Sequence, residues 1–66
     1  MSRICKRVRR ILHQERVAEP MIEEYVEGMI DSNTEEEMSR AKDHEIVADY
    51  RIAEPYIEAA LLARKI

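Results

Sequence analysis

Apolar residues recur at helical spacing through most of the chain, with charged residues between them. Over residues 3–18 one face is apolar, at Ile4, Cys5, Val8, Ile11 and Leu12. The opposite face carries cations at i, i+3, i+4 and i+7, namely Arg3, Lys6, Arg7 and Arg10. The alternation continues over residues 20–30, where the glutamates point outward. This pattern predicts two helices, at 3–18 and 20–30.

A turn is predicted at residues 31–34, which form the one cluster of small polar residues in the chain. Asn33 is the best candidate there for a left-handed backbone conformation. Thr34 followed by Glu37 has the spacing of a capping box, which predicts a helix that begins at residue 35. We expect that helix to run to about residue 53, and its two apolar rows indicate that it is covered on two sides.

Residues 55–65 are apolar almost all round, and only Glu58, Arg64 and Lys65 interrupt the run. A helix without a polar face should be buried. A chain of 66 residues has little material with which to bury it. We therefore expect a subunit interface in this segment. The residues assigned to that interface are Tyr56, Ile57, Ala60, Leu61 and Leu62.

The chain contains an internal repeat at an offset of 35 residues. Residues 16–23, Arg-Val-Ala-Glu-Pro-Met-Ile-Glu, match residues 51–58, Arg-Ile-Ala-Glu-Pro-Tyr-Ile-Glu, at six of eight positions. The simplest interpretation is two helical units related by a pseudo-twofold axis, over about 3–30 and 35–65. The alternative is a chance echo between two amphipathic helices, which the shared position of the proline disfavours.

The repeated proline, Pro20 and Pro55, either kinks each unit or divides it into two helices. Inside a helix, proline removes the hydrogen bond to the residue four positions earlier and disfavours the α conformation of the residue before it. Neither alanine nor glutamate caps a helix well, which favours a kink, whereas the steric rule favours a break. We expect a break, although four short helices and two kinked long ones both fit the pattern.

Together these features predict an all-α fold in a single domain. Two repeated, proline-interrupted helical units would form an antiparallel helical hairpin or bundle, joined at residues 31–34. The composition agrees, because one Gly and two Pro are too few for a loop-rich or β-rich fold. The chain has no Phe and no Trp, and its single cysteine, Cys5, excludes an internal disulfide. A core so small usually needs further support, and we expect a homodimer to supply it.

The lone cysteine suits a reducing compartment. The basic N-terminus is not followed by the apolar segment of a secretory signal. The longest apolar run, residues 59–63, is far shorter than the roughly 20 residues of a membrane-spanning helix. We therefore expect a soluble, cytoplasmic protein that does not associate with a membrane.

The net charge of −3 conceals a strong asymmetry. Residues 1–16 hold six of the eleven Arg and Lys and one of the fourteen acids, a net charge of +5, and the remaining fifty residues carry −8. The commonest reading of such a basic helix is pairing with the chain's own acids, or simple solvation. Nucleic acid comes next, whereas membrane binding is disfavoured because the apolar face has no Trp or Phe anchor. The residues assigned to nucleic acid or an acidic partner are Arg3, Lys6, Arg7, Arg9 and Arg10.

No catalytic triad, glycine-rich loop or cysteine pair occurs in the chain. We expect no enzymatic activity, no catalytic residues and no cofactor. The i, i+4 glutamate pairs of the repeat could gather round a divalent cation. Such glutamates are far more often a solvated face, so we expect no metal site.

We therefore expect a small helical protein-interaction module, such as an adaptor, inhibitor or assembly factor, that acts as a homo-oligomer. The alternative is a nucleic-acid-binding regulatory protein that uses the basic N-terminal helix. Charge reversal at Arg7 and Arg10 would separate the two hypotheses. It should abolish nucleic-acid binding under the alternative, and it should weaken assembly if the basic row pairs with a neighbour's acids.

Overall fold

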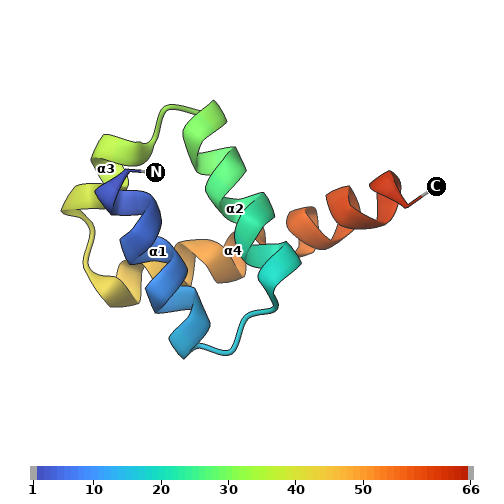
Figure 1. The fold of residues 1–66 in the computed structure, drawn as a ribbon, viewed down its shortest axis with the longest axis horizontal. Helices are drawn as coiled ribbons and strands as arrows, with labels where there is room; N and C mark the ends of the chain where they lie inside the picture. The colour runs from blue at the N-terminus through green and yellow to red at the C-terminus, as the bar shows by residue number, and fades with distance from the viewer. Residues whose placement is uncertain (1, 66) are drawn as a thin grey trace.

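The computed structural model describes residues 2–65, and within that range the chain is all-α (Figure 1). Four helices follow one another: α1 (Arg3–Gln14), α2 (Glu19–Asp31), α3 (Glu35–Arg40) and α4 (Asp43–Arg64). The long helix α4 runs across both α1 and α2, and its C-terminal half extends beyond the other helices (Figure 1). The all-α prediction and the turn after α2 are therefore confirmed.

The core lies where α1, α2 and α4 meet. The apolar face predicted for the first helix is buried, and Val8 and Leu12 have no exposed surface. From α4, Ile46 and Tyr50 fill the centre, and Ile57 closes the core further along the helix. Each fully buried aliphatic side chain contributes about 1.5–3 kcal/mol to the stability of the fold.

A residue with left-handed backbone conformation follows each of α1 and α2. Arg16 has φ 61° and Asn33 has φ 57°. At the end of α1, the Val17 N–H donates to the carbonyl of Leu12, five residues earlier, at 3.0 Å. The Thr34 N–H makes the equivalent bond after α2, to the Met29 carbonyl at 3.1 Å. These are Schellman motifs, which satisfy the last carbonyls of a helix, so the prediction for Asn33 is confirmed and the first helix ends earlier than residue 18.

The single helix predicted for residues 35–53 is wrong, because the chain divides after Arg40. Ala41 and Lys42 are extended, with ψ values of 150° and 159°. The predicted capping box at Thr34 is also wrong. The Thr34 hydroxyl donates backward to the Met29 carbonyl at 3.2 Å and makes no capping bond to α3. The first turn of α4 is held instead by Glu45, whose carboxylate accepts from the Lys42 N–H at 2.7 Å.

The two copies of the repeated octapeptide adopt different conformations. In the first copy the helix ends before Pro20, which lies in the first turn of α2, where proline is well tolerated. In the second copy α4 continues through Pro55 without a break. The chain therefore leaves the helix over residues 15–18, before Pro20, and the break expected at Pro55 is wrong.

Ion pairs beside the first copy distinguish it from the second. Arg9 contacts the carboxylates of Glu19 and Glu23, and His13 lies 3.1 Å from Glu19. These contacts hold the start of α2 against α1. Thirty-five residues later, the positions of Arg9 and His13 are occupied by His44 and Ala48. The second copy therefore lacks the arginine and the histidine that contact the glutamates of the first copy.

Candidate interaction surfaces

Two of the five basic residues predicted to face a partner are used inside the fold. Arg7 reaches from α1 to the α3–α4 junction, where its guanidinium donates to the Ala41 carbonyl and to Asp43, each at 2.7 Å. It also donates to the Met38 carbonyl at 3.4 Å. Arg9 donates two hydrogen bonds to the Glu23 carboxylate. Both side chains are therefore structural links between helices.

The other three predicted cations, Arg3, Lys6 and Arg10, are exposed. They lie on one face of α1, at i, i+3 and i+7. Within residues 2–65 none of them forms an ion pair. This shorter row is the part of the basic helix that remains open to a polyanion.

The C-terminal half of α4 carries a large uncovered apolar face. Tyr56 is 77% exposed, Ile52 73% and Leu62 62%, which are high values for residues of this size. The small residues Ala59 and Ala63 are exposed beside them. We call these five residues the outer face of α4.

The residues predicted as an interface divide between this outer face and the core. Tyr56 and Leu62 are exposed, as an interface requires. Ile57 is 7% exposed and packs into the chain's own core, and Ala60 and Leu61 are half-buried. Periodicity alone did not separate the two sides of α4, because both sides of this segment are apolar.

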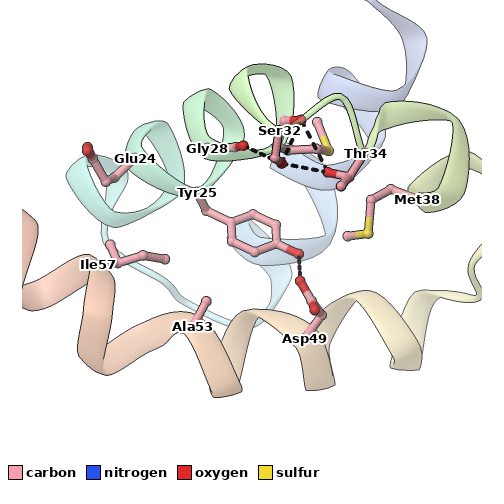
Figure 2. Close-up of a pocket in the computed structure, with 10 residues that line it drawn as sticks. Glu24, Tyr25, Gly28, Ser32, Thr34, Met38, Asp49, Ala53 and Ile57 are labelled. Atoms are coloured by element: carbon pink, nitrogen blue, oxygen red, sulfur yellow. Dashed lines mark hydrogen bonds between the residues drawn. The ribbon is translucent and has the colours of Figure 1, made fainter.

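A cleft between α2 and α4 was not predicted from the sequence (Figure 2). Its volume is about 260 Å³. Met38, Ala53 and Ile57 form apolar walls, and the ring of Tyr25 lies across it (Figure 2). The Tyr25 hydroxyl donates to the Asp49 carboxylate at 2.5 Å. One weak signal in the sequence was Gly28 in the middle of a helix, because a missing side chain leaves space.

Tyr25, which lines the cleft, packs against a second buried tyrosine, Tyr50. The rings of Tyr25 and Tyr50 pack edge to face, with centroids 5.6 Å apart, which is a favourable aromatic geometry. Burial raises the pKa of Tyr25 well above its usual value, and the hydrogen bond to Asp49 raises it further. Burial also raises the pKa of Tyr50 to about 12, with help from Glu54. Both phenols are therefore neutral hydrogen-bond donors at ordinary pH.

An ion pair connects the two helices beside the cleft. The Arg64 guanidinium, in the last turn of α4, lies 2.7 Å from the Glu24 carboxylate of α2. The Glu24 side chain is only 12% exposed. A carboxylate this buried favours a nearby cation, and Arg64, itself 62% exposed, supplies it from the last turn of α4.

No group of three or more His, Cys, Asp or Glu side chains among residues 2–65 could hold a metal ion. Cys5 is buried, and the paired glutamates Glu19 and Glu23 are occupied by Arg9 and His13. Among these residues, no helix has both the length and the apolarity needed to cross a membrane.

Comparison with protein-family models, with curated proteins and with solved structures found no match to this chain.

Proposed function

We propose that this chain is a small helical protein-interaction module that self-associates through the outer face of α4. The observation that supports this proposal is the exposure of Ile52, Tyr56 and Leu62 on one helix. A contiguous group of exposed apolar residues on so small a protein is typical of a binding surface. The occupant that we propose is the same face of a second copy.

The spacing of the outer face suits packing against another helix. Ile52, Tyr56, Ala59 and Ala63 follow intervals of four, three and four residues, which is the seam of a two-helix coiled coil. Leu62 lies along the edge of that seam. The projection of this half of α4 beyond the other helices leaves room for a second molecule (Figure 1).

The order of large and small residues makes this face complementary to itself. Ile52 and Tyr56 are large and lie toward the start of the seam, whereas Ala59 and Ala63 are small and lie toward its end. In an antiparallel pair, Ile52 would oppose the copy's Ala63, and Tyr56 would oppose its Ala59. Large side chains would then fill the space beside small ones, as close packing requires. A twofold dimer repeats this contact on both sides of its axis.

Sedimentation equilibrium over a range of concentrations tests the proposal. We expect the wild type to be a dimer, and Tyr56→Glu to weaken the association at least tenfold by placing a charge in the seam. Lys65→Gln is the matched control, because it changes the net charge by the same amount at an exposed residue outside the seam. A wild type that stays monomeric up to the high micromolar range would contradict the proposal.

Nucleic-acid binding is the second candidate function, and the exposed row of Arg3, Lys6 and Arg10 favours it. Three phosphate contacts would make the logarithm of the affinity fall with log salt at a slope of about −2.7. We expect Lys6→Glu with Arg10→Glu to abolish such binding to random duplex DNA or RNA. Arg40→Glu, at an exposed site on α3, is the control. No binding at low salt would eliminate this candidate.

A further inference from the structure

A second pocket, of about 280 Å³, lies where the two copies of the repeated octapeptide face each other. The first copy lines it with residues of the α1–α2 connection and the start of α2, and the second copy with residues of α4. These residues include Arg16, Val17 and Met21 from the first copy, and Arg51, Glu54 and Glu58 from the second. The repeat therefore contributes to both sides of one pocket.

The first copy of the octapeptide shows what its pair of glutamates can bind. Glu19 and Glu23 lie one helical turn apart at the start of α2, and the guanidinium of Arg9 contacts both carboxylates. Two nitrogen atoms of that guanidinium donate to Glu23. The first pair is therefore a guanidinium site that is filled by an arginine of the same chain.

Glu54 and Glu58 are the counterparts of these glutamates in the second copy. Each pair lies within one continuous helix, so its two carboxylates have the same i, i+4 spacing. Both Glu54 and Glu58 line the pocket, and neither forms an ion pair within residues 2–65. The second pair therefore has the arrangement that binds a guanidinium in the first pair, without the cation.

The other polar groups of the pocket leave this negative charge uncompensated. The guanidinium of Arg51 lies 3.2 Å from the Glu15 carboxylate. Arg16 is exposed and forms no ion pair within residues 2–65. Tyr50, which is 2% exposed, also lines the pocket, and burial together with the nearby carboxylates raises its pKa to about 12. Its neutral hydroxyl can donate a hydrogen bond but cannot balance a charge.

The remaining wall of the pocket is largely apolar. Val17, Met21 and Val47 line it and are half-buried. An arginine side chain matches this combination, because its charged end is carried on an apolar stem that packs along such surfaces. Small-molecule sites usually measure about 300–1,000 Å³, so a pocket of about 280 Å³ suits a single side chain.

We propose that this pocket binds the side chain of an exposed arginine on a partner protein. The guanidinium would lie against Glu54 and Glu58, as that of Arg9 lies against the glutamates of the first copy. Its stem would pack between Met21 and Val47. A planar guanidinium can donate to two carboxylates at once, whereas an ammonium is a compact point charge. The site therefore selects arginine over lysine.

The pocket is a different surface from the seam proposed for the dimer. None of the α4 residues that line it belongs to the outer face of α4. The inference therefore goes beyond self-association and stands if the chain is a monomer.

Substitution of the two glutamates tests the site. Glu54→Gln with Glu58→Gln removes both charges and keeps the size of each side chain. Glu27→Gln with Asp31→Asn is the matched control, because it makes the same charge change at two exposed residues of α2 that do not line the pocket. Arg16→Gln removes the unpaired cation at the pocket and should strengthen binding several-fold. Circular dichroism confirms that each variant is folded.

The probe is the pentapeptide Ala-Ala-Arg-Ala-Ala, acetylated and amidated so that the guanidinium is its only charge. It is titrated into the full chain at low salt, and binding is followed through the backbone amide resonances. We expect saturable shifts at Glu54, Glu58 and Val47 in the wild type and in the control variant. Loss of the two glutamates should weaken binding at least tenfold. The same peptide with Lys in place of Arg should bind at least fivefold more weakly.

Several outcomes would overturn the proposal. These are equal affinity for the variant without the two glutamates and its control, equal affinity for the Arg and Lys peptides, and no binding to the wild type. Shifts confined to the acidic face of α2, at Glu27 and Asp31, would also contradict it. The variant Tyr56→Glu should still bind the peptide, so failure of the dimer and failure of this inference are distinguishable.

Discussion

The guanidinium of Arg7 lies 2.7 Å from the carbonyl oxygen of Ala41, thirty-four residues away in the chain. Through this bond α1 holds the extended link between α3 and α4. The carbonyl of Ala41 follows the end of α3 and has no helical partner, so the arginine replaces the bond that a continuous helix would have supplied. Arg7 was predicted to contact a partner, but its guanidinium instead stabilises the fold.

Arg7→Ala should destabilise the protein by about 1.5–3 kcal/mol, because hydrogen bonds from a charged donor are lost at a half-buried site. Arg7→Lys should recover only part of this, since a single ammonium cannot reproduce the fork of a guanidinium. Urea unfolding followed by circular dichroism measures both. Arg10→Ala, on the exposed face of the same helix, should change stability by no more than about 0.5 kcal/mol. Equal effects at Arg7 and Arg10 would contradict this role.

The two prolines should respond differently to the same substitution. Pro55→Ala restores an N–H that can donate within α4, and it should stabilise the protein by up to about 3 kcal/mol. Pro20→Ala should have an effect below about 0.5 kcal/mol, because the N–H groups of a first turn have no helical partner in either case. Thermal unfolding of the two variants under identical conditions makes the comparison. A larger gain at Pro20 than at Pro55 would be inconsistent with the helix bounds.

Stability should fall at alkaline pH because of the buried tyrosines. The pKa of Tyr25 in the folded state lies above the ordinary value of 10.0, and that of Tyr50 is raised to about 12. A raised pKa means that folding favours the neutral phenol. The stabilisation is complete below pH 10 and is lost as the pH rises toward the folded-state values.

Tyr25→Phe removes one of these ionising groups, and its stability should decrease less steeply than that of the wild type between pH 10 and 12. Loss of the bond to Asp49 should cost about 1 kcal/mol at neutral pH. Urea midpoints over a pH series measure both effects. The exposed Tyr56→Phe serves as the control. Parallel pH profiles for Tyr25→Phe and the wild type would refute the assignment.

Gly28→Ala should stabilise the protein by about 0.8–1 kcal/mol, the difference in helix propensity between the two residues. The methyl group enters open space, so no packing cost opposes the gain. The measurement is the change in the midpoint of urea unfolding. A loss of stability would show that the space beside Gly28 is smaller than the structure indicates.

Much of the fold follows from local pattern, and the rest depends on contacts between distant residues. The buried face of α1 and the left-handed Asn33 were predictable, because helical periodicity and the tolerance of asparagine for positive φ act locally. Arg16 gave no such signal, since arginine has no special preference for that conformation. The division at Ala41 was not predictable either, because the group that stabilises it is Arg7, on another helix.

The candidate surfaces were likewise predictable only in part. An apolar segment at the C-terminus was evident, but its buried and exposed sides were not, because Ile57 and Tyr56 are both apolar and differ only in what lies beside them. The cleft requires α2 to approach α4 at Tyr25 and Asp49, twenty-four residues apart. The residue pattern of either helix alone does not indicate that the two helices approach each other at these residues.

The position of α4 also has a consequence during synthesis. The connections after α1, α2 and α3 span only four, three and two residues, so the loops cost little entropy to close. Ile46, Tyr50 and Ile57, however, leave the ribosome after all the side chains that they cover. Until then the apolar faces of α1 and α2 in the nascent chain are not covered by α4. The time between translation of residue 30 and residue 57 is therefore the period in which this protein is most exposed to aggregation and to chaperones.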